Sequence, residues 1–324
     1  MDPRAIFNIQ STDDFKQVAL EVFRFQYKSN KTYQEFCNHL GRTPNEVAAI
    51  TDIPFLPIEF FKSRKVSCGS HNEDIIFSSS GTTGSVTSKH YVTDLGVYEQ
   101  SFRQGFSYFY GDIKDYTILA LLPSYLERTG SSLIYMANDM IEQSGAKESG
   151  FYLDNIDQLA SQLKALDSSG RKVLLIGVSF ALLDVIEKHQ FQLKNTIIME
   201  TGGMKGRRKE LIRNELHQLL CQGFGVGSIH SEYGMTELLS QGYSKGDGVF
   251  GCPPWMKILI RDPEDPLSLL PVGKSGGLNV IDLANLNSCS FIATQDLGKL
   301  HGDFFEVIGR FDHSDIRGCN LMVL

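Results

Sequence analysis

Short apolar runs alternate with helix-like segments between residues 116 and 230, and this alternation constrains the fold more strongly than any other feature. The apolar runs predict strands over residues 116–122, 173–178, 196–200 and 226–230. Between them, apolar side chains recur at helical spacing around residues 133–136 and over 156–166, 180–189 and 207–221. Because predicted strands and helices alternate along the chain, we predict an α/β fold with a mostly parallel sheet covered by helices.

The segments on either side differ in character. The first sixty residues predict helices, one starting behind a capping box at residues 11–14 and another over residues 32–40. Beyond residue 250, strands are predicted over residues 256–261, 278–283, 290–294 and 304–308, separated by turn-forming residues. We therefore expect a helical entry with an α/β body over residues 1–250, and a β-rich subdomain over residues 251–324.

Composition excludes several classes of protein. The 324 residues include 31 Lys and Arg against 38 Asp and Glu, and the resulting charge of −7 argues against a nucleic-acid partner. The most apolar stretch, residues 173–186, is too short to span a bilayer. Six scattered cysteines without a Cys-x-x-Cys pair, and no signal sequence at the start, predict reduced thiols in a cytoplasmic protein.

A run of hydroxyl and glycine residues, 78–88, follows a strand-like segment and precedes Lys89. Glycines let the backbone approach an anion, and hydroxyls and amides donate hydrogen bonds to phosphate oxygens. The P-loop pattern G-x-x-x-x-G-K-[ST] does not fit, because counting from Gly81 places Val86 and Thr87 at the second Gly and the Lys. The segment is therefore a phosphate loop of another kind or a flexible turn.

Residues 231–237 directly follow the predicted strand 226–230. Ligands gather beyond the carboxyl ends of strands in open α/β sheets, so this position suits a binding site. Tyr233 offers a stacking face, Thr236 a hydroxyl, and Glu237, expected to be exposed at the strand end, an oxygen ligand for Mg²⁺. The alternative is a turn followed by a helix with Thr236 as its N-cap.

Two later segments carry polar side chains beside predicted strands. Asp296 stands in a Thr-Gln-Asp-Leu-Gly sequence at a predicted strand end, where a carboxylate can accept hydrogen bonds from two ribose hydroxyls. An ordinary turn is the alternative. Residues 307–319 lead from a strand into a charged turn that contains Arg310 and Cys319.

Together, these four segments resemble motifs of the adenylate-forming (acyl- and aryl-CoA ligase) superfamily. Residues 79–84 match its Ser/Thr-Ser-Gly-Thr-Thr-Gly phosphate loop, and residues 233–237 match Tyr-Gly-x-Thr-Glu. Asp296 matches its ribose-binding Asp, with Gln295 replacing the usual Gly, and residues 309–312 match its Gly-Arg-x-Asp hinge segment. The resemblance covers roughly residues 50–324.

This resemblance implies an ATP site. The residues implied to bind phosphates are Ser79, Ser80, Gly81, Thr82, Thr83 and Gly84. Gly202 and Gly203 would border the adenine, and Tyr233 would stack on it. Thr236 would contact the α-phosphate, Glu237 would hold Mg²⁺, and Asp296 with Arg310 would fix the ribose. Stabilising the charged transition state also needs cations, with Lys89 a candidate beside Lys205 and Arg207, whose alternative is a solvated helix start.

Within the superfamily, the chain looks most like the LuxE family, the acyl-protein synthetases of bacterial fatty-acid reductase systems. Residues 57–62, 122–128 and 317–319 carry this closer resemblance. It implies that ATP activates a fatty acid to an acyl-adenylate, that a cysteine near the C-terminus, matched by Cys319, takes the acyl group, and that an acyl reductase receives it. The mobile C-terminal lid domain of other superfamily ligases, with its catalytic lysine, is expected to be absent, which argues against ordinary CoA ligation.

Alternatives remain for the thiol and for the activity. Arg317 and His313 near Cys319 favour a reactive thiolate, whereas a free cysteine is often only a buried apolar residue. Cys68 and Cys252 are the other candidate nucleophiles. The alternative activities are an acyl- or aryl-CoA ligase of the phenylacetate type, with or without a lid from another chain, and a non-catalytic nucleotide-binding scaffold.

Overall fold

The computed structural model describes residues 3–70, 72–79, 86–123, 130–153, 155–202 and 211–311. These residues form two compact units. The terminal unit comprises the described residues within Met1–Phe60, Val66–Gly69 and Pro254–Leu324, and the central unit those within Phe61–Lys65 and Ser70–Pro253. The first sixty residues, expected to belong with the α/β body, belong to the same unit as the β-rich segment.

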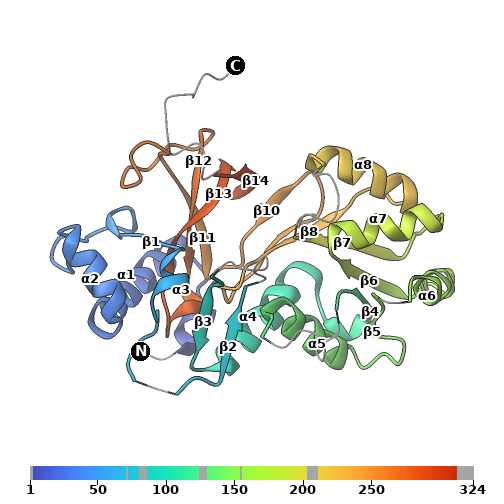
Figure 1. The fold of residues 1–324 in the computed structure, drawn as a ribbon, viewed down its shortest axis with the longest axis horizontal. Coiled ribbons are helices and arrows are strands. Elements are labelled where there is room, and N and C mark those ends of the chain that lie inside the picture. Colours follow the sequence, from blue (N-terminus) through green and yellow to red (C-terminus); the bar gives the residue numbers. More distant parts are fainter. Residues whose placement is uncertain are drawn as a thin grey trace. The chain divides into compact units, whose positions relative to one another are not determined.

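A largely parallel sheet forms the centre of the central unit (Figure 1). Its strands, in spatial order, are β10 (Val249–Gly251), β9 (Gly242–Ser244), β8 (His230–Tyr233), β7 (Thr196–Thr201), β6 (Lys172–Gly177), β4 (Tyr116–Leu121) and β5 (Gly150–Phe151). Neighbours from β5 to β8 run parallel, and β9 and β10 are antiparallel additions. Every residue of β4 is buried, as a strand covered on both faces requires.

Helices cover both faces of this sheet, with α7 and α8 on one side and α4 and α5 on the other (Figure 1). The helices are α3 (Phe60–Ser63), α4 (Leu95–Tyr110), η3 (Ile113–Asp115), α5 (Ser132–Ser144), α6 (Ile156–Ser168), α7 (Ser179–Lys188) and α8 (Arg213–Phe224). The side chains of Asp94, Ser131 and Asn155 accept hydrogen bonds at the starts of α4, α5 and α6. A separate hairpin pairs β2 (Ile75–Ser78) with β3 (Lys89–Val92).

The terminal unit is built on an antiparallel sheet with strand order β11 (Met256–Arg261), β12 (Ser275–Asp282), β13 (Phe291–His301) and β14 (Phe304–Arg310). The short β1 (Leu56–Pro57) pairs parallel to β13. The helical elements of this unit are η1 (Pro3–Asn8), α1 (Thr12–Ser29), α2 (Lys31–His39), η2 (Ile50–Asp52) and η4 (Leu283–Asn285). Phe23 of α1 and Tyr33 of α2 contact Phe291 of β13, which places an aromatic cluster at the core.

The predicted α/β class is confirmed, and several elements begin where the sequence placed them. Ser11 caps α1 by accepting a hydrogen bond from the Asp14 amide. Two strands differ most from expectation. β8 covers 230–233 rather than 226–230, because Gly225 adopts a left-handed conformation (φ 67°) at the end of α8 and the chain straightens only after residue 229. β13 runs through Asp296 to His301 instead of ending at residue 294.

The start of α8 also differs, since the helix begins at Arg213 and not at residue 207. Residues 203–210 lie outside the described part of the chain. Among the described residues, no helix is long and apolar enough to cross a membrane.

Candidate active site

The base of the predicted phosphate loop is held by a pair of serines. The Ser79 amide donates to the Ser88 carbonyl oxygen over 3.1 Å, and the Ser88 amide donates to Ser79 Oγ over 3.0 Å. Ser79 therefore closes the loop, a role that engages its hydroxyl. Lys89 follows as the first residue of β3 and is exposed. The other predicted loop residues lie outside the described part of the chain: Ser80, Gly81, Thr82, Thr83 and Gly84.

The residue after Lys89 connects this hairpin to the Tyr-Gly-x-Thr-Glu segment. His90 is fully buried, and its Nδ1 lies 2.8 Å from the backbone carbonyl oxygen of Thr236. Burial lowers the pKa of His90 to about 4, so the ring is neutral near pH 7. The structure thus connects the strand that follows the predicted phosphate loop with the Tyr-Gly-x-Thr-Glu segment.

Thr236 and Glu237 lie in a turn after β8. The Leu238 amide donates to the Met235 carbonyl oxygen over 3.1 Å, and no helix begins at Thr236 in this described segment. The alternative of a helix N-cap is therefore wrong. The expectation of an exposed Glu237 is also wrong, because only 5% of its surface is accessible. The adjacent Leu238 and Leu239 are buried, and burial of these apolar side chains keeps the turn close to the core.

Gly202 and Tyr233 lie at the carboxyl ends of the neighbouring strands β7 and β8. Gly202 directly follows β7, and its carbonyl oxygen accepts a 2.7 Å hydrogen bond from Ser179 Oγ. Tyr233 is the last residue of β8, not a residue beyond the strand, and is 8% exposed. Its ring meets Phe250 edge-on at 6.0 Å between centroids. Gly203, Lys205 and Arg207 lie outside the described residues.

A buried carboxyl group beside Tyr233 was missed by the sequence analysis. Thr201 Oγ1 donates to Glu232 Oε2 over 2.5 Å, across paired positions of β7 and β8. Burial raises the pKa of Glu232 to about 7; the Thr201 hydrogen bond opposes this shift, and the nearby charge of Glu200 adds to it. A Cβ at Gly234 would overlap Glu232 Oε1. In the sequence, this group is visible only as a charged residue directly before the Tyr-Gly-x-Thr-Glu motif.

Glu200 lies at the end of β7 with polar neighbours from the covering helices. Ser179 Oγ, at the start of α7, donates to Glu200 Oε2 over 3.2 Å. His217 Nε2 of α8 lies 3.7 Å from Glu200 Oε1. Together with Glu232, these side chains form a polar cluster at the carboxyl ends of two parallel strands, where α/β folds place their sites.

Asp296 and Arg310 of the terminal unit form an ion pair, with Arg310 Nε 2.9 Å from Asp296 Oδ1. Asp296 lies within β13 instead of at a strand end, because the following Leu-Gly forms a β-bulge and not a turn. A Cβ at Gly298 would overlap the backbone oxygen of Glu306 on β14. The absence of a side chain at Gly298 therefore lets the strand continue.

Two neighbours fix the backbone around Asp296. The guanidinium group of the buried Arg261 donates to the carbonyl oxygens of Leu278 and Thr294 and lies 5.3 Å from the Phe311 ring centroid. Gln295, which replaces the usual glycine, donates to the Glu59 carboxylate. Glu59 belongs to residues 57–62, one of the segments that carried the closer family resemblance.

Of the candidate nucleophiles, Cys319 lies outside the described residues. Cys68 is buried, and desolvation raises its pKa to about 12, which disfavours the thiolate. Cys252 is partly exposed, and all five described cysteines are free thiols. No group of three or more His, Cys, Asp or Glu side chains suited to a metal ion occurs in the part of the chain that is described.

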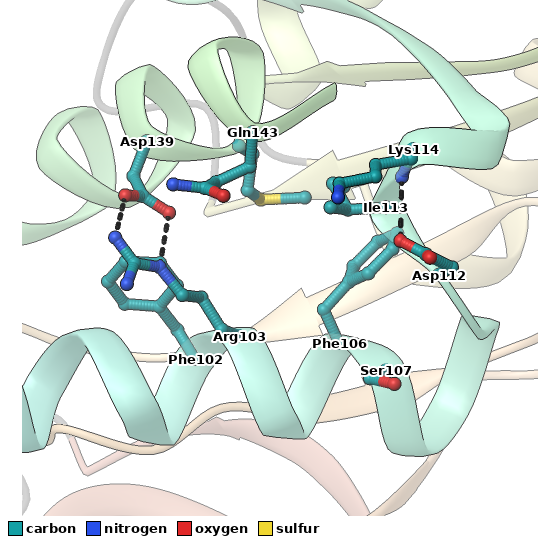
Figure 2. Close-up of a pocket in the computed structure, with 10 residues that line it drawn as sticks. Phe102, Arg103, Phe106, Ser107, Asp112, Ile113, Lys114, Asp139 and Gln143 are labelled. Atoms are coloured by element: carbon teal, nitrogen blue, oxygen red, sulfur yellow. Dashed lines mark hydrogen bonds and ion pairs between the residues drawn. The ribbon is translucent and has the colours of Figure 1, made fainter. Parts of the chain in front are cut away.

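A cavity of about 380 Å³ lies between α4, η3 and α5 (Figure 2). Phe102, Phe106 and Ile113 contribute apolar walls, and Arg103 on α4 pairs with Asp139 on α5 across one side. None of the predicted site residues lines it. The cavity is therefore a feature of the helical layer and separate from the motif residues.

Adenylate-forming ligases are among the solved structures that share this fold. 2-Hydroxyisobutyryl-CoA ligase, in complex with 2-HIB-AMP and CoA, aligns with a TM-score of 0.65 at 11% identity, over 93% of this chain and 75% of the ligase. ATP-bound MatB from Rhodopseudomonas palustris aligns with a TM-score of 0.55 at 18% identity, over 74% of this chain. The chain spans about half of MatB, 49%. The fold is that of the N-terminal part of adenylate-forming ligases.

Proteins of similar sequence point to a smaller group among the ligases that have this fold. The family model "Acyl-protein synthetase, LuxE" matches residues 1–121. The "Long-chain-fatty-acid--luciferin-component ligase" of Vibrio harveyi is 27% identical over 93% of this chain and 84% of its own length. The protein of the same name from Photorhabdus luminescens is 33% identical over 70 residues, which are 21% of this chain and 60% of that protein. The predicted resemblance to LuxE acyl-protein synthetases is confirmed.

Proposed function

We propose that this protein activates a long-chain fatty acid with ATP and transfers the acyl group to a protein thiol. The observation that carries the proposal is the match with the Vibrio harveyi fatty-acid ligase along nearly the whole chain. The adenylate-forming fold supports the same chemistry. Attack of the fatty-acid carboxylate on the α-phosphorus would release pyrophosphate and form an acyl-adenylate. Attack of a thiolate on its carbonyl carbon would then release AMP and leave a thioester.

The motif residues divide this work among them. The phosphates would be bound by the loop whose base is closed by Ser79 and Ser88, with Lys89 supplying positive charge. Thr236 would contact the α-phosphate, Tyr233 and Gly202 would border the adenine, and Asp296 with Arg310 would hold the ribose. Cys319 would carry the acyl group.

Glu237 is the residue proposed to hold Mg²⁺. Mg²⁺ in nucleotide sites is usually bound by one or two carboxylates, with phosphate oxygens and water completing its octahedron. A single buried carboxylate in the turn after β8 fits this pattern. Such a site does not require a cluster of three or more ligating side chains, and none occurs among the described residues. When bound, the ion would neutralise charge on the phosphates, while the protein would hold the carboxylate at a fixed place.

A second candidate function is ligation of the acid to CoA. The observation that favours it is the TM-score of 0.65 with 2-hydroxyisobutyryl-CoA ligase. Release of AMP with fatty acid and ATP, measured with and without CoA, separates the two activities. Strictly CoA-dependent release would support the CoA ligase.

The experiment that tests the main proposal is exchange of labelled pyrophosphate into ATP with a panel of carboxylic acids, from short-chain to long-chain. Exchange that needs a long-chain acid is expected, followed by acyl labelling of the protein. Absence of exchange with every acid would refute adenylation and favour a non-catalytic nucleotide-binding scaffold. Delivery to an acyl reductase and a cytoplasmic location are further parts of the proposal, and pull-down of acyl-labelled protein tests the first.

A further inference from the structure

His90 has a chemically defined orientation in the central unit. A carbonyl oxygen only accepts hydrogen bonds, so the contact with Thr236 requires the proton on Nδ1. In the neutral ring, Nε2 then carries a lone pair. This atom is shielded from solvent and has no hydrogen-bond partner among the described residues. The ring edge meets Phe61 at 5.6 Å between centroids.

Stability alone does not account for a histidine here. A hydrogen bond contributes little net free energy in water, while an acceptor buried without a partner carries a cost of similar or larger size. An aromatic residue without nitrogen would fill the same space and remove the unpaired Nε2, and it would leave the Thr236 carbonyl oxygen without this donor, so the two costs nearly cancel. What such a residue could not supply is the bond to Thr236.

The bond joins two parts of the proposed nucleotide site. His90 points inward on β3 between the buried Val92 and Ser88, while Lys89 on the same strand is exposed. Ser88 is the residue that closes the phosphate loop through Ser79. On the other side of the bond, Thr236 is only partly buried, and Glu237 follows it.

We infer that His90 is a positioning residue that holds the Thr236–Glu237 turn at a fixed distance from the phosphate-loop hairpin. The inference rests on the proposed function, because it assigns a consequence for adenylation to this contact. His90 needs no contact with the nucleotide. It acts through the Thr236 backbone, so that the Thr236 hydroxyl and the Glu237 carboxylate keep one geometry relative to β3.

Three variants separate the hydrogen bond from the packing of the ring. His90→Asn retains a donor near the Nδ1 position, His90→Gln moves the donor toward the Nε2 position, and His90→Phe keeps a ring without donors. Val92→Ala is the matched control, because it removes buried volume from the same face of β3 and leaves the bond in place. Each variant is assayed for folding by thermal melting and for kcat and KM of pyrophosphate exchange.

For His90→Phe and His90→Gln, kcat should fall about tenfold to a hundredfold, the effect of misplacing a reacting group by about 1 Å. The kcat of His90→Asn should lie within about threefold of that of the unaltered protein, because the amide can still donate to Thr236. A threefold difference in rate corresponds to less than about 1 kcal/mol of barrier. Val92→Ala should melt at a lower temperature with an unchanged kcat. Normal kcat in folded His90→Phe, or equal losses in folded His90→Asn and His90→Phe, would overturn the inference. If His90→Phe fails to fold, the ratio between His90→Asn and His90→Gln decides in the same way.

Failure of the proposed function has a different signature. In that case the unaltered protein itself shows no acid-dependent exchange. The inference about His90 is then decided by calorimetric titration with Mg²⁺ and α,β-methylene-ATP. Weaker binding by His90→Phe than by both His90→Asn and Val92→Ala supports it, and equal binding by all three overturns it.

Discussion

Arg310 Nε donates a 2.9 Å hydrogen bond to Asp296 Oδ1 across directly paired positions of β13 and β14. The carboxylate is largely buried, whereas the Arg310 side chain is 73% exposed. Ion pairs with one exposed partner contribute little to stability. The pair instead fixes the direction of a carboxylate on the bulged part of β13.

Asp296→Asn should weaken recognition of the ribose, because a carboxylate accepts from two hydroxyls and an amide offers one oxygen. We expect KM for ATP in pyrophosphate exchange to rise about tenfold, and the preference for ATP over 2′-deoxy-ATP and 3′-deoxy-ATP to shrink. Asp303→Asn, at the exposed turn between β13 and β14, is the control. An unchanged nucleotide preference would contradict the assignment of Asp296.

Glu237→Gln should reduce adenylation by at least about tenfold, or roughly 1.4 kcal/mol of barrier. The same variant should need more Mg²⁺ for half-maximal exchange, because an amide is a weaker ligand for a hard cation. Since Glu237 is buried, folding must be verified by thermal melting. Glu215→Gln on the exposed side of α8 should change neither quantity. Unchanged exchange and Mg²⁺ dependence in Glu237→Gln would remove Glu237 from the site.

Cys319→Ser should separate the two half-reactions. A hydroxyl does not ionise in the range in which a thiol does, so acyl transfer should stop while pyrophosphate exchange continues. Labelled acyl chain plus ATP should mark the unaltered protein, and neutral hydroxylamine should release the label. Cys68→Ser should still be labelled, because burial raises the pKa of Cys68 to about 12. Acyl labelling of folded Cys319→Ser would mean that another group carries the acyl chain.

Glu232 predicts a pH dependence of stability with a definite sign. Its pKa is raised by burial from 4.5 to about 7, so between these values the folded state binds more protons than the unfolded state. The contribution of Glu232 is therefore fully present below about pH 4.5, declines as pH rises, and is lost above about pH 7. The full difference is on the order of 3 kcal/mol.

Glu232→Gln removes this titration. The free energy of unfolding of the variant, relative to that of the unaltered protein, should rise from pH 5 to pH 8. Urea denaturation at each pH measures both values. Glu264→Gln in the exposed segment after β11 provides the comparison for a carboxylate outside the core. A difference between Glu232→Gln and the unaltered protein that stays constant with pH would show that Glu232 ionises normally.

Elements with a strong local pattern could be predicted from sequence. α1 begins behind Ser11, and β11 has the predicted bounds Met256–Arg261, because a capping box and an apolar strand are signals within a few residues. β8 was misplaced, since the apolar Val226 and Ile229 precede it while the strand itself carries the buried Glu232. A search for apolar runs does not find a strand whose charged residue is buried.

The site was predictable only as motifs. Asp296 and Arg310 were both identified, but their pairing depends on the register of β13 and β14. The contact between His90 and Thr236 joins residues 146 positions apart, and no local pattern encodes it. A turn at residues 296–298 was the alternative to a strand end, and the β-bulge was not foreseen, because a bulge and a turn both favour a glycine such as Gly298.

The close approach of Glu232 to Gly234 has a consequence for how this motif can evolve. A methyl group at position 234 would require the end of the Glu232 side chain to move. Because the same carboxyl group accepts a hydrogen bond from Thr201, a change at 234 would also disturb the contact between β7 and β8. A shorter side chain at 232 would remove this link, so the effect of a change at 234 depends on which residue occupies 232.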